Sequence, residues 1–240
     1  ASSKFSDSAG NTNADGSEDN NSLTLSVDTV RPTIAITSDA SSLKAGETTT
    51  VTFTLSEAAS DFIEGDISVS GGSLSSFAAS SSTVYTATFT PTADSTTDGV
   101  ISVASSKFSD SAGNTNADGS DSNNTLTLSV DTVRPTIAIT SGASSLKAGE
   151  TTTVTFTLSE AATDFVEDDI SVTGGLLSSF SGSGTTYTAT FTPTADSTTN
   201  GVISVASSKF SDSAGNENTD GSDSNNTLTL SVDTVRPTIA

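Results

Sequence analysis

Carboxylates are the side chains through which this chain could do chemistry. The 240 residues include 29 Asp and Glu against 8 Lys and Arg, which gives a net charge of -21, and no Cys, Met, Trp or His. Without a thiol or an imidazole, the sequence offers no soft-metal ligand and no His that could activate a Ser as a nucleophile. We therefore expect that the protein is not an enzyme. Its inventory of oxygen ligands suits hard cations, above all Ca²⁺.

The same charge balance restricts the partners of the chain. Nucleic acids are bound through a basic surface that neutralises phosphates, and a net charge of -21 argues against such a surface, so we expect no nucleic acid. No apolar run approaches the roughly 20 residues of a membrane-spanning helix. We therefore expect no membrane insertion in this segment.

The candidate ligands recur because the chain repeats itself. The segment ASSKFSDSAGN begins at positions 1, 104 and 206, and DTVRPTIA begins at positions 28, 131 and 233. A period of about 100 residues corresponds to one small domain. The chain then divides into the C-terminal fragment of a preceding repeat at 1–29, complete repeats at 30–132 and 133–234, and the first-strand fragment of a following repeat at 235–240.

Each repeat has the pattern of an all-β domain. Apolar and polar residues alternate with a period of two, as in TIAIT at 33–37 and VTFTL at 51–55, which is typical of half-buried strands. In the first repeat we expect strands at 32–37, 48–55, 66–70, 73–78, 83–90, 99–105 and 125–130. Seven short strands, without a Cys pair or a core Trp, predict an Ig-like Greek-key β-sandwich with Phe53, Phe89 and Phe108 in its core. The predicted fold is therefore a linear array of tandem Ig-like sandwiches.

This topology predicts where the acids meet. The chain entry and the loops after the second, fourth and sixth strands share one pole of an Ig-like sandwich, and the other loops share the opposite pole. Opposite poles of consecutive domains face each other across the linker at 131–135. The candidate metal ligands at these poles are Asp28, Glu57, Asp66, Asp94, Asp110 and Asn114 and, one repeat later, Asp131, Glu160, Asp169, Asp196, Asp212, Asn216 and Asp233.

Two interpretations of these acids remain open. They form either a solvated acidic surface that keeps a long chain soluble, or calcium sites at the domain junctions. The second interpretation is favoured because uncompensated acids within about 10 Å repel one another, and because Ca²⁺ takes six to eight oxygen ligands.

The loop after the sixth strand contains a second, weaker metal signal. Asn114, Asn116, Asp118 and Gly119 match the start of an EF-hand loop, but Thr125 stands where the final Glu is expected, so the loop is not an EF-hand. The alternative is a long hairpin rich in Asn and Gly for conformational reasons. Of the two halves of this loop, the proximal half from Asp110 to Asn114 is the better candidate ligand donor.

Five motifs, in order along the repeat, resemble the bacterial Ig-like repeats of giant surface adhesins of the RTX type, which are exported by type I secretion. They are VDTVRPTIAIT, LKAGETTTVTFTLSEA, DDISVTGG, YTATFTPTAD and FSDSAGN. The resemblance implies a β-sandwich extender with calcium at the interdomain linkers, which positions cells on surfaces or in biofilms. The ligands that the resemblance implies are Asp131, Glu160 and Asp212, with Asp28, Glu57 and Asp110 one unit earlier.

The leading functional prediction is a calcium-rigidified spacer of a large bacterial cell-surface adhesin. Such a spacer would lie outside the cell, contact neighbouring repeats of the same chain through calcium-bridged junctions, and project a distal binding region whose target the sequence does not give. The alternative is that the repeats themselves bind a glycan or a protein surface. Near-identity between the two units favours the spacer, because repetition preserves length and supplies no unique surface.

Overall fold

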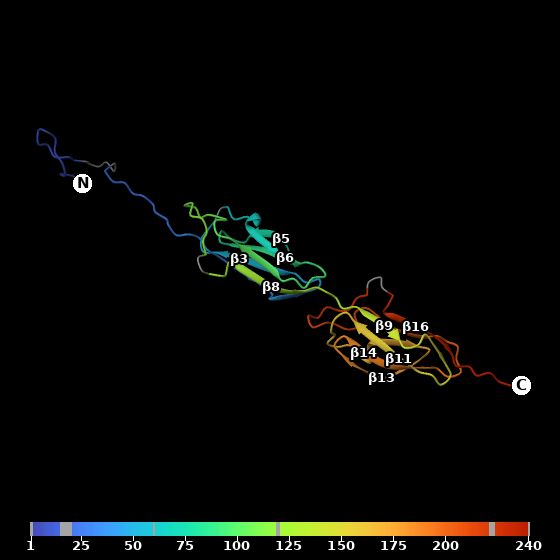
Figure 1. The fold of residues 1–240 in the computed structure, drawn as a ribbon. Helices are drawn as coiled ribbons and strands as arrows, with labels where there is room; N and C mark the ends of the chain where they lie inside the picture. Colours follow the sequence, from blue (N-terminus) through green and yellow to red (C-terminus); the bar gives the residue numbers. More distant parts are fainter. Residues whose placement is uncertain (1, 15–20, 60, 119–120, 221–223, 240) are drawn as a thin grey trace.

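Two β-sandwiches follow one another along the chain in the computed structural model, which describes residues 2–14, 21–59, 61–118, 121–220 and 224–239 (Figure 1). An extended N-terminal arm leads into the first sandwich, and a short linker joins the first to the second. The described residues are strand, turn and two short 3₁₀ turns, so the prediction of tandem all-β Ig-like domains is confirmed.

Each sandwich has eight strands and one 3₁₀ turn. The first consists of β1 (Ile34–Ser38), β2 (Ser42–Lys44), β3 (Thr49–Leu55), η1 (Glu64–Asp66), β4 (Ile67–Ser70), β5 (Gly72–Ala79), β6 (Val84–Pro91), β7 (Gly99–Val103) and β8 (Thr125–Asp131). The second consists of β9 (Ile137–Ser141), β10 (Ser145–Lys147), β11 (Thr152–Leu158), η2 (Glu167–Asp169), β12 (Ile170–Thr173), β13 (Gly175–Ser183), β14 (Thr186–Pro193), β15 (Gly201–Val205) and β16 (Thr227–Asp233).

The strands form two four-stranded sheets in each domain, in the orders β1-β3-β6-β5 and β2-β8-β7-β4 in the first and β9-β11-β14-β13 and β10-β16-β15-β12 in the second. All neighbours are antiparallel except the pairs β2–β8 and β10–β16, which are parallel. This is the division of an Ig-like sandwich, with the first edge strand split between the sheets. Strand β2 was not predicted, because its three residues, Ser42-Leu43-Lys44, are too few to show an alternating pattern.

The core follows the predicted alternation. In β3 every second residue is buried, and Thr occupies the outward positions. Phe53, Phe89 and Phe108 are at most 2% exposed, as expected. The structure adds Phe62, whose ring makes edge-to-face contacts with Phe108 and Tyr85 at centroid separations of 5.2 and 5.1 Å. Such pairs stabilise a core beyond the area they bury.

The N-terminal arm reproduces one loop of the complete domains. The carboxylate Oδ1 of Asp7 accepts hydrogen bonds from the backbone N–H groups of Ala9 and Asn11, both at 2.9 Å. In the folded domain, Oδ1 of Asp110 accepts the same two bonds, from the backbone N–H groups of Ala112 and Asn114. Residues 21–29 of the arm are not in a strand and expose Leu23 by 83%. The loop conformation is therefore encoded locally, whereas the last strand needs its sheet.

We predict that Gly201→Ala destabilises the second domain by about 1–3 kcal/mol, the usual cost of overpacking a core. A Cβ at this position would lie 2.5 Å from Cζ of the buried Phe191. Gly142→Ala is the matched control, since its Cβ would meet nothing closer than Thr152 Oγ1 at 3.5 Å. Hydrogen exchange of the second domain's amides measures both changes. Equal protection in the two variants would contradict the prediction.

Candidate metal centre

Three carboxylates meet where the linker enters the second domain. Asp131 is the last residue of β8, Glu160 lies just after β11, and Asp212 lies in the loop after β15. One oxygen from each of the three lies within 4.8 Å of the others. The sandwich topology brings these distant segments to one pole, so the cluster combines the linker with two loops of the domain that follows it.

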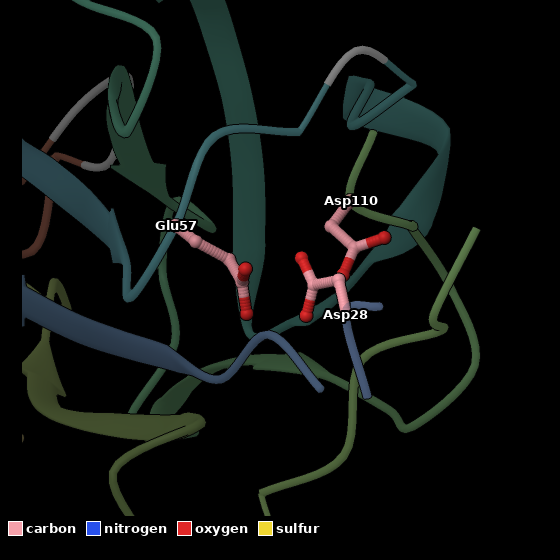
Figure 2. Close-up of side chains that lie close together, drawn as sticks. All are labelled: Asp28, Glu57 and Asp110. Atoms are coloured by element: carbon pink, nitrogen blue, oxygen red, sulfur yellow. The ribbon is translucent and has the colours of Figure 1, made fainter. Parts of the chain in front are cut away.

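The first domain repeats this arrangement with Asp28, Glu57 and Asp110, again within 4.8 Å of one another. Figure 2 shows the three carboxylate groups turned toward a common space, with Glu57 on one side and the two Asp on the other. The six residues implied by the family resemblance are therefore the six that the structure gathers into clusters.

The Asp of each loop is held rigidly by the loop itself. In the second domain, Oδ1 of Asp212 accepts from the backbone N–H of Asn216 at 2.9 Å, and Oδ2 accepts from its Nδ2 at 2.8 Å. Asp212 is only 4% exposed. In the first domain the corresponding bonds, led by the one from the Asn114 side chain, lower the pKa of Asp110. Hydrogen bonds of this kind keep a carboxylate ionised where it is buried.

The Glu of each cluster is in the opposite situation. Oε1 of Glu160 and Oε1 of Glu57 are buried and have no hydrogen-bond partner among the described residues. Desolvation, followed by the charges of Asp212 and Asp131, raises the pKa of Glu160. In the first domain, desolvation, followed by the charges of Asp110 and Asp28, raises the pKa of Glu57. A buried carboxylate oxygen without a donor, facing two further carboxylates, fits a cation that would supply the missing positive charge.

Three carboxylates supply only part of the shell of a calcium ion. Ca²⁺ takes six to eight oxygens at 2.3–2.6 Å, with carboxylates bound through one or both oxygens and waters or carbonyls completing the set. Oxygen ligands without nitrogen or sulfur favour calcium or magnesium over transition metals. The donors of both clusters therefore fit a hard divalent cation.

The other predicted ligands lie outside the two clusters. Asp66 and Asp169 cap the 3₁₀ turns, because Oδ2 of each accepts from the backbone N–H three residues earlier, at 2.9 Å. Asp233 is exposed at the end of β16, where its Oδ1 accepts from the Val235 N–H at 3.2 Å.

Asp94 and Asp196 also stay apart from the carboxylate clusters. Both are exposed and have left-handed backbone conformations, with φ of 50° and 51°. Asp94 lines a cavity of about 350 Å³ together with Arg134, and Asp196 lines the equivalent cavity with Arg236. Asp94 thus lies beside the linker, where topology placed it, and its role as a metal ligand stays a prediction.

Asn114 and Asn216 lie beside the clusters as hydrogen-bond donors. Nδ2 of Asn216 donates to the backbone oxygen of Asp131 at 3.0 Å as well as to Asp212. Nδ2 of Asn114 bonds Asp28 and Asp110 in the same way, at 3.2 and 2.8 Å. Each Asn thus ties the linker to the loop that carries the cluster's second Asp.

The residues that resemble an EF-hand hold the domain's own backbone. Oδ1 of Asn116 accepts from the N–H groups of Lys107 and Phe108, at 2.7 and 3.1 Å. Oδ1 of Asp118 accepts from Ile34 N–H at 2.7 Å, while its Oδ2 is buried without a partner among the described residues. Gly119 lies outside the described residues. The hairpin interpretation accounts for Asn116, and metal binding in the distal half of the loop stays a prediction.

Lys44 and Ala45 are junction residues that sequence reasoning missed. They belong to the turn after β2 in the first domain, yet they bond residues 215 and 216 of the second. The topology that placed the acids also places this turn at the junction, so the signal was present in the sequence. The prediction for the junction was limited to acidic side chains and therefore did not include Lys44 and Ala45.

Two Ig-like sandwiches in series, each entered through a carboxylate cluster, form a tandem array of β-sandwich domains. The sequence profile of the bacterial Ig-like domain matches residues 28–127 and 131–229. The chain belongs to this family, with two copies in tandem.

Solved structures similar to this chain include bacterial adhesins. The Escherichia coli adhesin FdeC is 19% identical, with a TM-score of 0.46 over 83% of this chain and 64% of that chain. Invasin, a bacterial integrin-binding protein, is 14% identical, with a TM-score of 0.43 over 84% of this chain and 40% of that one. This chain thus spans less than two thirds of either. The comparison with curated proteins finds no match.

Within the described part of the chain, no helix has the length and apolar character of a membrane span.

We predict that Glu160→Gln raises the melting temperature of the metal-free protein by a few degrees at pH 7. The substitution removes the charge that repels Asp131 and Asp212. Because the pKa of Glu160 is higher in the folded than in the unfolded chain, the folded state binds more protons just above pH 4.5, and acidification from pH 7 toward that value should stabilise the native protein in EDTA.

Calorimetry in EDTA between pH 7 and pH 5 measures this effect. Glu150→Gln is the matched control, because Glu150 lies outside the cluster and pairs with Lys147 at 3.4 Å. If Glu160→Gln lowers the melting temperature in EDTA, the cluster is not under electrostatic strain.

Proposed function

We propose that this chain is a calcium-rigidified spacer from a large bacterial surface adhesin of the RTX type, secreted by the type I route. The observation that carries the proposal is the pair of matching carboxylate clusters at the domain entrances, each with a buried Glu oxygen that has no partner among the described residues. A bound cation would supply that partner and cancel the repulsion within the cluster.

The linker is the element that such a cation would fix. On the side of the first domain, buried Thr132 donates from Oγ1 to the backbone oxygen of Thr92 at 2.7 Å and accepts from Ser95 N–H at 2.9 Å. On the side of the second domain, Asp131 faces Glu160 and Asp212. Two adjacent linker residues thus contact different domains: Thr132 contacts the first and Asp131 the second. A cation bound by Asp131, Glu160 and Asp212 would hold the linker to the second domain as Thr132 holds it to the first.

A spacer suits the rest of the molecule better than a binding module does. Protein surfaces that bind glycans commonly present exposed aromatic rings, whereas Tyr85 and Tyr187 are each 8% exposed and the chain has no Trp. The cluster residues are the same in both repeats. In this proposal the partners of each repeat are its neighbours in the chain, the location is the bacterial cell surface, and adhesion or biofilm formation is performed by a region beyond these repeats. No catalytic role is proposed.

Calcium should raise the melting temperature of both domains. A ligand that binds only the folded state stabilises it by about 2.7 kcal/mol at 100 times its Kd. Calorimetry with millimolar calcium and with EDTA tests this, and identical transitions in the two conditions would refute the calcium site. Glu160→Ala and Asp212→Ala should each remove much of the gain of the second domain. Asp121→Asn, an exposed control outside the clusters, should leave the gain intact.

Calcium should also narrow the range of shapes of the two-domain chain. With the cluster neutralised, Asp131 is attached to the second domain as Thr132 is to the first, and the chain should scatter X-rays as a rod of about 80–100 Å, estimated from strands of 3.3 Å rise per residue plus the polar loops. In EDTA the distance distribution should broaden. A rod that is equally narrow in both conditions would show that packing alone holds the junction, and a chain that stays flexible in calcium would contradict the spacer.

A further inference from the structure

A second set of contacts crosses the junction beside the carboxylate cluster. Nζ of Lys44 donates to the backbone oxygen of Gly215 at 3.0 Å, and Ala45 N–H donates to Oδ1 of Asn216 at 2.7 Å. From the linker, Nη1 of Arg134 donates to the backbone oxygen of Glu217 at 3.2 Å. We call this set the junction latch; its six residues, Lys44, Ala45, Arg134, Gly215, Asn216 and Glu217, line one small cavity of about 120 Å³.

Asn216 is the centre of the junction latch. Its Nδ2 holds the linker oxygen of Asp131 and the carboxylate of Asp212, while its Oδ1 receives the N–H of Ala45 from the preceding domain. One side chain therefore contacts the first domain, the linker and the loop that carries the cluster. Its amide is satisfied by protein groups, so it orients two of the three cluster residues by hydrogen bonds.

The chain contains its own comparison for this effect. Asn114 occupies the equivalent position at the first cluster, which has no turn like Lys44–Ala45 before it in this chain. Asn114 is half-buried, whereas Asn216 is 2% exposed. On the donor side, Lys44 is half-buried against Gly215, whereas Lys147, at the same place in the second domain, is exposed. The preceding domain is what buries the second site.

We infer that the turn after β2 positions the metal site of the next domain. Lys44 and Ala45 are positioning residues: through Asn216 they favour the alignment in which Asp131 faces Glu160 and Asp212, with or without a cation. When only a fraction of molecules is aligned, the apparent Kd for a cation rises by the inverse of that fraction. The inference rests on the proposed calcium function for its effect on affinity, but the effect of the latch on alignment does not depend on calcium.

Ala45→Pro removes the central donor with little disturbance of the turn. Glu47 N–H donates to the Lys44 oxygen at 3.1 Å, and Gly46 has a φ of +83° at the third position, as in a type II turn. Proline is favoured at the second position of such a turn, which is Ala45. The turn at 147–150 has the same hydrogen bond at 3.1 Å and the same φ of +83° at Gly149. Ala148→Pro is therefore a matched control that carries the same substitution without a domain to contact.

The alignment of the two domains is measured by double electron–electron resonance, which gives the distribution of distances between two spin labels. Because the chain has no Cys, Ser68→Cys on β4 and Ser171→Cys on β12, both exposed, label one position in each domain. In EDTA, Ala45→Pro and Lys44→Ala should broaden the distance distribution, whereas Ala148→Pro and Lys147→Ala should match the unsubstituted chain. In a calcium titration, the two latch variants should need about two- to tenfold more calcium to reach the narrow distribution, the fold-change expected from losing one hydrogen bond.

The two arms of the experiment separate this inference from the proposed function. If Ala45→Pro gives the same distribution as Ala148→Pro in EDTA, the latch does not position the domains and the inference is wrong. If the latch variants broaden the distribution in EDTA but calcium narrows none of the samples, the latch stands and the calcium proposal fails. Equal melting temperatures of the two proline variants in EDTA show that the turn tolerates the substitution.

Discussion

Repulsion among three carboxylates held within 4.8 Å of one another is the interaction around which each junction is organised. Like charges at such separations repel one another, and this repulsion opposes folding. The chain does not relieve this strain by spreading the acids apart. Asp212 is instead fixed by two bonds from Asn216, and a buried oxygen of Glu160 has no donor among the described residues. A bound cation, as proposed above, would cancel the repulsion within the cluster.

The folded core of the sandwich holds these carboxylates in place against their mutual repulsion. The core of each domain is built from rings that are fully buried, such as Phe191 and Phe210, and these fix the ends of the strands from which the loops depart. The loop that carries Asp212 is further tied to the first strand, since Oδ1 of Asp220 accepts from Ile137 N–H at 2.8 Å. Because the loop cannot move away, the charge carried by Asp212 stays next to the linker. The stability of the core therefore determines how firmly the charge of Asp212 is held beside Asp131 and Glu160.

The sequence predicted most of this organisation because its signals are periodic. Alternation of Thr with large apolar residues indicates the strands, and the repeat indicates the domains. The same topology places Asp131, Glu160 and Asp212 at one pole. It does not distinguish Asp169 from them, because the distinction depends on a single 2.9 Å bond to the Val166 N–H that caps a 3₁₀ turn. Likewise Asp94 lies at the junction by topology, but its side chain lines a cavity with Arg134 of the linker and stays outside the carboxylate cluster. Loop position is visible in a pattern of residue types, whereas the direction of a side chain is not.

Three kinds of contact meet at the junction, and together they determine how consecutive domains of an array would be oriented. The carboxylate cluster joins the linker to the following domain, Thr132 joins the linker to the preceding one, and the turn at Lys44–Ala45 reaches across to Asn216. No single domain contains all three. In the proposed spacer, stiffness is therefore a property of consecutive pairs: each domain carries the cluster at its entrance and, at its far end, the turn that we infer orients the cluster of the next. A repeat inserted anywhere in such an array would bring one complete junction with it, so the array can change in length while every junction keeps the same geometry.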